Sequence, residues 1–514
     1  MSRVDRVVVV VFDGLRPDMI EGRMPVLHGF AKGNLWFTEA RSVFPSMTRV
    51  ATTSFATGQW PRAHGIVNNA FHMPGVVQGA PLDTSNFDHL SRLRAPEPVV
   101  TCESLGHALA AAGLRMGAVH CGSAGSSFLV NHDVARHGHW TFSAHGEGFT
   151  QTPEAVRQAV ASHGPLPAQD VPKLATLDYA RRAFLDMALG ENAPDVALMW
   201  LPEPDTTWHH FGLGSPEAHQ VMAAADAVFA DVLEAVSAML GQTAVIAMSD
   251  HGQITTTSQT DITAEMQAGG LPASHRPEPA HKLALTRGNV GEIRSLDGDM
   301  GLIHAACDWL MARDDIGMVF ARDDLVEQLP GSLPQSLVMH GHPRDPELFF
   351  LMRSLDDPDT WGLPGQGGLI AGVPLGGGMH GGLNRFELTT TLVVQASGAR
   401  QGTDASPVGL VDIAPTIAGL LGLEMQADGA PLPLFEARRS TATPQVFREG
   451  REGFAQELRR NTVDGRAYLD HGGRAGCGRC KRTKDEEETS TSDGQFNDDV
   501  ATFYDTNHDG ADAS

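Results

Sequence analysis

The sequence predicts an α/β protein with a mostly parallel central sheet, helices on both of its faces and a smaller inserted cap. Three continuous apolar runs carry this prediction: residues 7–12 (VVVVVF), 195–201 (DVALMWL) and 244–248 (AVIAM). Such runs are typical of strands that are buried on both faces of a parallel sheet. Helical patterns over 103–113 and 216–240 separate them. This alternation indicates right-handed βαβ units.

The alternation of strands and helices is interrupted after residue 251. Residues 252–345 hold Gly/Pro-rich loops, one predicted helix around 300–312 and a short predicted strand at 316–320. We interpret them as an inserted cap. A strand is expected again at 347–352 and a helix at 411–421. The predicted core therefore comprises residues 1–251 and 346–435, with a C-terminal extension over 436–514.

Composition excludes several classes of protein. The chain has 514 residues, is 41% hydrophobic and has a formal net charge of −24, so nothing indicates the basic surface that nucleic-acid binding requires. No apolar stretch is long enough to span a membrane, and the opening run is too short for a signal peptide. We expect a cytoplasmic protein. Five scattered cysteines argue against a disulfide framework.

Each of the three predicted strands is followed by a carboxylate. These are Asp13, Asp205 and Asp250. Ligand sites in open α/β sheets lie outside the carboxyl ends of the strands, so the three should converge on one edge. Converging like charges raise one another's pKa unless a cation neutralises them. A metal ion is the natural partner, although each Asp could instead cap the next helix.

Histidines accompany these carboxylates. His209 lies four residues after Asp205, on the same face if the segment is helical, and His251 directly follows Asp250. His380 lies in the Gly-rich segment GGGMHGGLN. Histidine with carboxylate suits zinc, and manganese is an alternative. His340 and His342 (MHGHPRD) compete with His380, but we expect them to line the cap.

A nucleophile is expected in residues 44–58 (FPSMTRVATTSFATG). Residues 49–56 can form a helix that ends at Gly58, which places Thr48 near the helix N-terminus. Backbone N–H groups there favour a phosphate oxyanion and a developing alkoxide. Ser46 satisfies the same criteria, and both residues could simply be N-caps.

Several stretches together resemble the type I phosphodiesterase/nucleotide pyrophosphatase family of the alkaline phosphatase superfamily. They are VFDGLRPDM (11–19), FPSMTRVATTSFATGQWPRAHGIVNN (44–69), EPDTTWHHFG (203–212), SDHG (249–252) and MHGG (379–382). LVDIAPTIAGLLGL (410–423) resembles the closing helix of the superfamily. The resemblance implies an alkaline-phosphatase-like fold over about residues 5–425.

The resemblance also implies roles for individual residues. The nucleophile would be Thr48, sixteen residues before the histidine of an HGI segment, and Asn69 would bind phosphate. Two zinc ions are implied. One would be held by Asp13, Thr48, Asp250 and His251, and the other by Asp205, His209 and His380. The expected reaction is hydrolysis of a phosphodiester or nucleotide pyrophosphate bond through a phosphothreonine intermediate.

Arg49 departs from the family pattern, which has an aromatic residue directly after the nucleophile. A guanidinium can bind phosphate oxygens in a bidentate manner, so Arg49 is a candidate for substrate binding. Phosphate monoesters and phosphonates therefore remain alternative substrates. A phosphonoacetate hydrolase-like enzyme is the main alternative, with Lys32 and Lys173 as unsupported candidates for its carboxylate-binding lysines. An inactive metal-binding scaffold is an alternative of another class.

Other motifs do not fit these interpretations. Sulfatases need a C/S-x-P-x-R pattern, which residues 42–49 (SVFPSMTR) do not contain. A lone CxxC (Cys477, Cys480) and a partial calcium-loop pattern from Asp505 are interpreted as composition of the tail. Residues 481–514 are acidic and poor in apolar side chains, which predicts disorder. The sequence does not indicate an oligomeric state.

Overall fold

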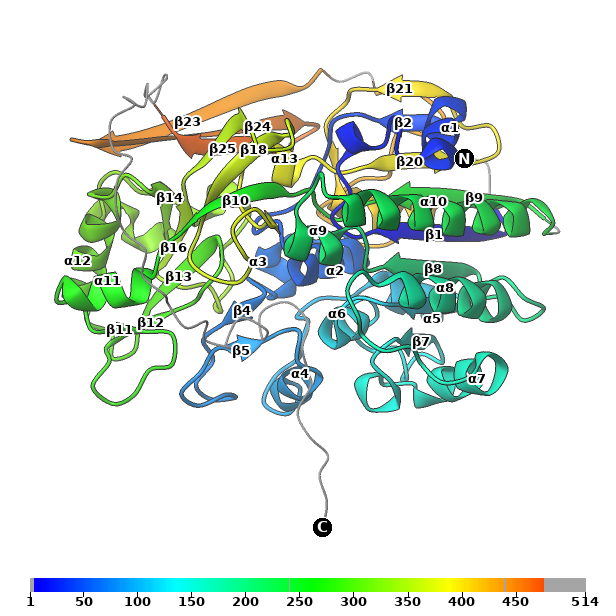
Figure 1. Cartoon of the computed structure of the whole chain (residues 1–514), viewed down its shortest axis with the longest axis horizontal. Helices are drawn as coiled ribbons and strands as arrows, with labels where there is room; N and C mark the ends of the chain where they lie inside the picture. Colours follow the sequence, from blue (N-terminus) through cyan, green and yellow to red (C-terminus); the bar gives the residue numbers. More distant parts are fainter. Residues whose placement is uncertain (1–3, 240, 439–440, 476–514) are drawn as a thin grey trace, which may run out of the picture.

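A computed structural model describes residues 4–239, 241–438 and 441–475 (Figure 1). The predicted disordered tail (481–514), Cys477, Cys480 and the partial calcium-loop pattern all lie outside the described residues. Among the residues that are described, no helix has both the length and the apolar character needed to cross a bilayer.

The core of the molecule is an eight-stranded sheet. Its spatial order is β21 (Gly402–Asp404), β2 (Leu35–Phe37), β20 (Leu392–Gln395), β9 (Thr243–Met248), β1 (Arg6–Phe12), β8 (Val196–Leu201), β6 (Met116–His120) and β7 (Trp140–Ser143). Only β20 runs antiparallel to its neighbours in this sheet. The three predicted apolar runs form its adjacent strands β9, β1 and β8.

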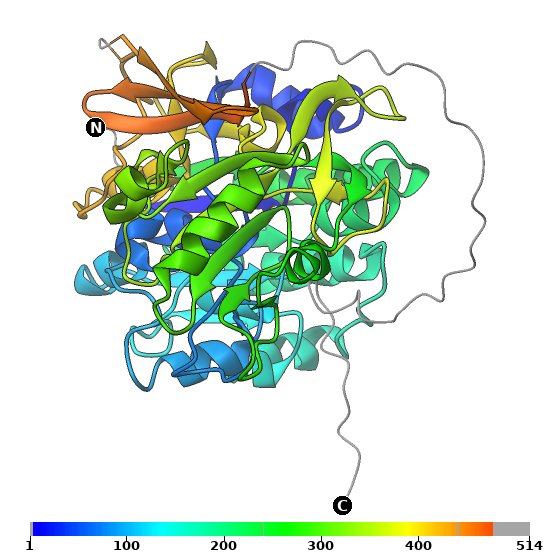
Figure 2. The same cartoon turned by 90° about the vertical axis from the view of Figure 1, so that its left-hand side faces the viewer.

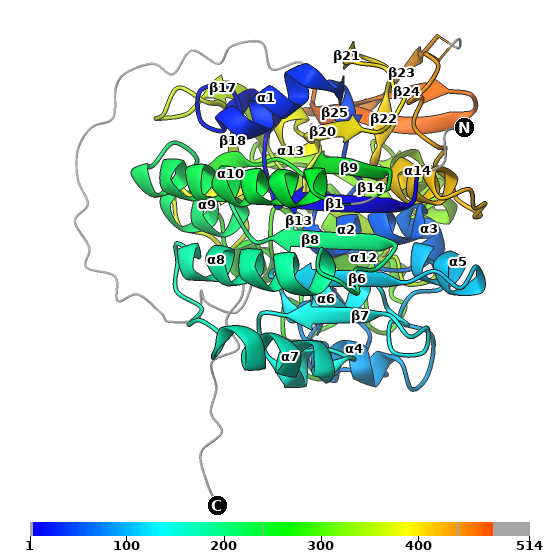
Figure 3. The same ribbon diagram turned by 90° about the vertical axis from the view of Figure 1, so that its right-hand side faces the viewer.

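Helices cover both faces of this sheet, because the side chains of its central strands alternate between two hydrophobic clusters. Val7, Val9 and Val11 of β1 pack with α2 (Thr48–Thr57), α5 (Leu105–Ala111), α6 (Ala124–Leu129) and α14 (Ile413–Leu420). Val8 and Val10 pack on the opposite face. The helices on that face are α1 (Pro25–Gly33), α7 (Pro153–His163), α8 (Leu174–Ala183) and α10 (Pro216–Ser237), which lie in front of the sheet in Figure 3. The predicted fold class is confirmed.

A second, six-stranded sheet lies beside the core, and Figure 2 views the molecule from this side. Its order is β11 (Ala273–Ser274), β12 (Leu283–Leu285), β13 (Val290–Ser295), β16 (Leu348–Met352), β14 (Ile316–Ala321) and β15 (Leu333–Pro334). Helices α11 (Ile262–Ala268) and α12 (Met300–Met311) share its hydrophobic cluster.

We retain the division into core, insert and extension as a proposal, with one change at the end of the insert. The strand predicted at 347–352 does form, as β16, but it pairs with β13 and β14 rather than with the central sheet. The insert that we propose therefore continues past residue 345, at least to 352.

A four-stranded sheet brings together segments that are distant in the chain. Its order is β17 (Ser354–Pro358), β18 (Pro364–Leu369), β10 (Ile254–Gln259) and β19 (Gly378–Met379). Strand β10 begins shortly after β9, so its pairing with β19 carries residue 380 back to the end of the central sheet.

Residues 443–474 form a three-stranded antiparallel sheet, β23 (Thr443–Arg451), β24 (Phe454–Val463) and β25 (Arg466–Arg474). Its contacts tie it to the rest of the molecule. Gln456 is fully buried and its amide forms hydrogen bonds with both the N–H and the carbonyl of Val319 in β14. The backbone N–H of Gly472 donates to Leu383, close to His380.

Candidate metal centre and nucleophile

Three carboxylates meet at the carboxyl ends of β9, β1 and β8. Asp13 follows β1 directly, Asp250 lies two residues past β9, and Asp205 is the first residue of α9 (Asp205–Phe211), which follows β8. Because these strands are parallel neighbours, their ends converge and bring the carboxylates together. The predicted convergence is thus present in the structure, and all three side chains are buried.

His251 lies between two of these carboxylates. Its Nε2 is 3.5 Å from Asp13 Oδ1 and 3.2 Å from Asp250 Oδ2. The same Nε2 lies 3.1 Å from Oγ1 of Thr48. One half of the site therefore contains a hydroxyl, an imidazole and two carboxylates around a common point.

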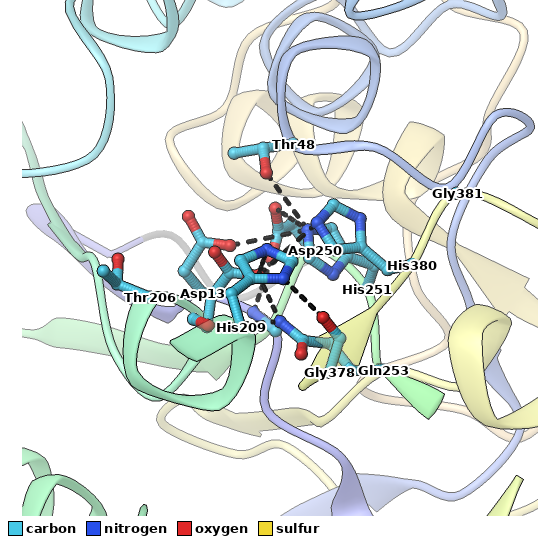
Figure 4. Close-up of polar contacts among 12 residues, drawn as sticks. Asp13, Thr48, Thr206, His209, Asp250, His251, Gln253, Gly378, His380 and Gly381 are labelled. Atoms are coloured by element: carbon cyan, nitrogen blue, oxygen red, sulfur yellow. Dashed lines mark hydrogen bonds and ion pairs between the residues drawn. The ribbon is translucent and has the colours of Figure 1, made fainter. Parts of the chain in front are cut away.

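The other half of the site is built around Asp205. His209 Nε2 lies 3.3 Å and His380 Nε2 3.5 Å from Asp205 Oδ1. Residues 205 and 209 occupy one face of α9, as predicted from their spacing. The rings of His380 and His251 stack with centroids 3.6 Å apart, so the two halves are contiguous (Figure 4).

All three imidazoles point the same nitrogen toward the centre. The Nδ1 atom of His209 lies 2.6 Å from the carbonyl oxygen of Gly378, and the Nδ1 atom of His380 lies 2.8 Å from that of Ser46. His251 Nδ1 is 3.1 Å from the carbonyl oxygen of Gly252. A carbonyl only accepts, so each Nδ1 carries the proton and each Nε2 directs a lone pair inward.

The carboxylates are held by donors on their outer sides. Trp200 Nε1 donates to Asp13 Oδ2 at 2.9 Å, and the Gly14 N–H donates to Asp250 Oδ1 at 3.1 Å. The remaining oxygens, Asp13 Oδ1 and Asp250 Oδ2, are buried and accept no hydrogen bond from the described residues. Buried carboxylate oxygens in this state are suited to a cation.

The three buried carboxylates at the centre repel one another. Burial raises the pKa of Asp13 well above its ordinary value, and the neighbouring Asp250 and Asp205 raise it further. Burial also raises the pKa of Asp250. Burial disfavours the charged form of Asp205 too, but the three surrounding imidazoles, when protonated, lower its pKa below the ordinary value. Divalent ions would remove this repulsion, so the residues present fit two metal ions.

Thr48 is the first residue of α2, and its hydroxyl points at the centre (Figure 4). Met47 precedes it as the N-cap and makes no side-chain cap, so Thr48 is not an N-cap. The structure also separates Thr48 from Ser46. Ser46 Oγ donates to the Gly382 carbonyl at 2.9 Å and accepts from the Gly381 N–H. Ser46 therefore anchors the loop that carries His380.

Arg49 and Asn69 lie beside the helix N-terminus. The Arg49 N–H donates to Asn69 Oδ1 at 3.2 Å, which directs the amide nitrogen of Asn69 away from this bond. Arg49 is buried, and its Nε has no hydrogen-bond partner among the described residues. Arg49 also lines a cavity at the centre, together with Asp13, Thr48, Gly122, Ser123, Pro202, Asp205, Thr206, His209 and His210.

Several other candidates lie away from this centre. His340 is buried between the Asp345 carboxylate and the Phe44 carbonyl, at 2.8 Å and 2.9 Å, and His342 Nε2 lies 3.2 Å from Thr101 Oγ1. Lys173 is buried and donates to Gln169 at 3.0 Å. Lys32 is exposed at the end of α1. Neither lysine lines the cavity.

Other residues of the site were not predicted. Gln253, the residue before β10, donates to Asp205 Oδ1, and Trp200 supports Asp13 from within β8. Ser123 and Thr206 line the cavity. The position of Ser123 just beyond β6, at the same sheet edge as the aspartates, was the only available signal.

Comparisons with known proteins agree with this fold. The model of the family described as type I phosphodiesterase/nucleotide pyrophosphatase matches residues 7–278. This is more than half of the 514 residues. The chain belongs to this family. No curated protein matches it significantly.

Solved structures of this family have a similar fold. Human ectonucleotide pyrophosphatase/phosphodiesterase 5 superposes with a TM-score of 0.57 and 17% identity, covering 83% of this chain and 97% of that chain. An inactive variant of the murine ectonucleotide pyrophosphatase/phosphodiesterase 5, in complex with AMP, has a TM-score of 0.56 and 16% identity, with 83% and 97% covered.

Proposed function

We propose that this chain is a metal-dependent hydrolase that cleaves phosphate esters, with a phosphodiester or nucleotide pyrophosphate bond as its target and Thr48 as its nucleophile. One observation carries the proposal: the Thr48 hydroxyl lies at a helix N-terminus and faces three imidazoles and three carboxylates whose ligand atoms converge. Membership of the family supports the class of reaction.

We propose two divalent ions, zinc in the first instance and manganese as the alternative. Asp13, Thr48, Asp250 and His251 would hold one ion, and Asp205, His209 and His380 the other. When bound, such ions supply Lewis acidity, which lowers the pKa of a hydroxyl and neutralises charge on phosphate oxygens. The inward Nε2 lone pairs and the two unpaired carboxylate oxygens support this assignment.

The reaction that we propose has two displacements. Thr48 Oγ1 loses its proton and attacks phosphorus in line with the leaving oxygen. The new O–P bond gives a phosphothreonine, while the ester O–P bond breaks and its oxygen takes up a proton. Water then attacks phosphorus and loses a proton, the O–P bond to Thr48 breaks, and Thr48 Oγ1 takes up a proton. Asn69 would donate from its amide nitrogen to a non-bridging oxygen as charge develops.

Small-molecule phosphate esters are the proposed substrates. The complex of the murine neighbour with AMP supports a nucleotide. Arg49 favours a second candidate, a substrate with a terminal phosphate or a phosphonate. Its buried Nε is unpaired and its side chain lines the cavity, so an anionic group of the substrate would provide its partner.

Replacing the nucleophile is the first test. Thr48→Ala should lower kcat by at least about a thousandfold, because loss of a nucleophile removes the covalent pathway. Thr48→Ser should retain substantially more activity, because it keeps a hydroxyl. Zinc content and the melting temperature of both variants should be compared with the parent. Comparable activity in Thr48→Ala and Thr48→Ser would contradict the assignment.

A substrate panel separates the two candidates. The zinc-loaded protein would be assayed with bis-p-nitrophenyl phosphate, p-nitrophenyl phosphate, p-nitrophenyl phenylphosphonate and phosphonoacetate. We expect the diester to be preferred, with little effect of Arg49→Gln. A preference for the monoester or phosphonoacetate that Arg49→Gln abolishes would overturn the diester and assign substrate recognition to Arg49. Inactivity on every phosphate and phosphonate, with both ions bound, would favour the scaffold.

A further inference from the structure

A second group of metal-ligand side chains lies outside the site described above. His107 belongs to α5, and His132 and Asp133 belong to the turn that connects α6 to β7. One ligand atom from each of the three lies within 4.8 Å of the other two. None of the three residues lines the cavity at the Thr48 centre.

The geometry within this group matches that of a ligand set. His107 Nε2 lies 3.4 Å from Asp133 Oδ2. The rings of His107 and His132 have centroids 5.2 Å apart with an interplanar angle of 38°. His137 approaches from the end of the same turn, edge-on to His107 with centroids 4.4 Å apart. The ligand atoms that converge are therefore those of His107, His132 and Asp133, with the His137 ring beside them.

Two of these histidines have buried nitrogens with no hydrogen-bond partner among the described residues, namely Nδ1 of His132 and Nδ1 of His137. His132 is 7% exposed, so only a small part of its ring is in contact with solvent. An imidazole nitrogen that is buried without a hydrogen-bond partner loses its hydration, and no new interaction offsets this cost in free energy. A metal ion bound within this cluster would give the His132 imidazole a partner.

The remaining atoms of the cluster are already oriented. Arg94 binds Asp133 through Oδ1, which leaves Oδ2 on the side of His107. Arg94 also donates to Gln151 Oε1 at 2.8 Å, and Gln151 Nε2 donates to the His132 carbonyl at 2.9 Å. Such outer contacts are what fix ligands around a metal.

His107 can adopt the tautomer that ligation needs. Its Nδ1 lies 3.0 Å from Ser104 Oγ, which can accept a hydrogen bond from Nδ1–H in the tautomer that leaves the Nε2 lone pair available. The rival arrangement has Nδ1 accepting from the Ser104 N–H at 3.2 Å and Nε2–H donating to Asp133. A metal ion can bind Nε2 in the first arrangement, whereas in the second arrangement Nε2 carries a proton and cannot bind one.

An open cavity of about 780 Å³ gives access to the cluster, and His107, His132, Asp133 and His137 all line it. We propose that His107, His132 and Asp133 form an additional zinc site, which joins α5 to the α6–β7 turn. Two imidazoles and a carboxylate are ligands that zinc accepts. The site is independent of the proposed hydrolase activity.

Metal content tests the proposal on the full chain. Protein dialysed against a small excess of zinc would be analysed by inductively coupled plasma mass spectrometry, as the parent, His132→Gln and His107→Gln. We expect each variant to hold one zinc ion per chain fewer than the parent, with phosphatase and phosphodiesterase rates unchanged. His219→Gln, an exposed histidine on α10, is the matched control and should lose none.

A second measurement keeps the test independent of the Thr48 centre. In a background that carries both His251→Asn and His380→Asn, which removes one proposed ligand from each ion of the Thr48 centre, cobalt(II) should still give the visible absorption of a four-coordinate site, and His132→Gln should remove it. Equal zinc content in the parent, His132→Gln and His107→Gln would overturn the proposal and favour the His107–Asp133 hydrogen bond. Loss of folding in one variant would show as a changed circular dichroism spectrum, and the other variant then decides.

Discussion

Gln253 lies directly behind the candidate metal centre, where its Nε2 donates to the Asp205 carboxylate. The contact fixes the carboxylate that lies closest to His209 and His380. Residues in this position act on metal affinity through the ligand that they orient. The effect of replacing such a residue can therefore be distinguished by experiment from the effect of replacing a metal ligand.

Gln253→Met should weaken metal binding by about ten- to a hundredfold, because it removes the donor and keeps the volume. The apparent dissociation constant for zinc, measured with a competing chelator, checks this. Gln259→Met is the matched control. Gln259 lies at the other end of β10 and donates to the Val373 carbonyl, away from the centre. Equal affinities in the two variants would contradict a role for Gln253.

At the scale of residues, the sequence predicted those side chains whose position follows from strand ends. Asp13, Asp205 and Asp250 each follow a buried run within a few residues, and the structure brings them together as predicted. Gln253 and Trp200 could not be predicted, because their contacts depend on where distant segments cross. His380 depended on the family resemblance, since a histidine in a Gly-rich loop has no regular spacing to locate it.

At the scale of elements, α2 begins at the candidate nucleophile and ends sharply at its other end. Gly58 terminates it with φ +67°, a left-handed conformation that side chains with a Cβ disfavour. A Cβ there would lie 2.9 Å from the Ala427 Cβ and 3.1 Å from Pro415 Cδ. The end of α2 is therefore packed against the segment that follows α14.

Gly58→Ala should destabilise the protein by more than the about 1–2 kcal/mol that a left-handed alanine costs, because the added methyl also clashes. Gly22→Ala is the control. Gly22 has φ +77°, but a Cβ there meets nothing within 4 Å. Thermal unfolding of both variants measures the difference. A melting temperature that falls equally in the two would show that the contact with Ala427 relaxes without cost.

The elements whose bounds the sequence predicted most closely were those in which the apolar residues follow a single periodicity. The helix predicted at 216–240 is α10 (Pro216–Ser237), and the one predicted around 300–312 is α12 (Met300–Met311). The sheet over 443–474 was not predicted. Only one face of β24 is buried, and charged side chains occupy the other. Its apolar signal is therefore weaker than that of a strand covered on both sides.

At the scale of the whole molecule, Glu292 links the six-stranded sheet to the loop that precedes Asn69. It lies in β13, is fully buried, and its Oε1 accepts from Asn68 Nδ2 at 2.9 Å. Burial raises its pKa to about 8, and the lowering effects of Arg294 and Asn68 do not offset this. The folded protein therefore keeps a proton that the unfolded chain releases near its ordinary pKa of 4.5.

This pKa difference predicts a pH-dependent stability. Between about pH 5 and pH 8 the unfolded state binds fewer protons than the folded state, so stability falls as pH rises through the folded pKa, by up to about 1.4 kcal/mol per pH unit. Glu292→Gln should remove this loss, so its melting temperature relative to the parent should increase from pH 5 to pH 8. Glu327→Gln, at an exposed glutamate, is the control. A pH-independent difference would contradict the buried proton.

The distribution of the proposed ligands along the chain has a consequence for biosynthesis. Those of one ion, Asp13, Thr48, Asp250 and His251, are all present once residue 251 has been translated, before the six-stranded sheet exists. The other ion has to wait for His380, which reaches its position only when β19 pairs with β10. A growing chain would thus acquire the two proposed ions in a fixed order. Occupancy of the second would mark a chain whose translation has passed residue 380.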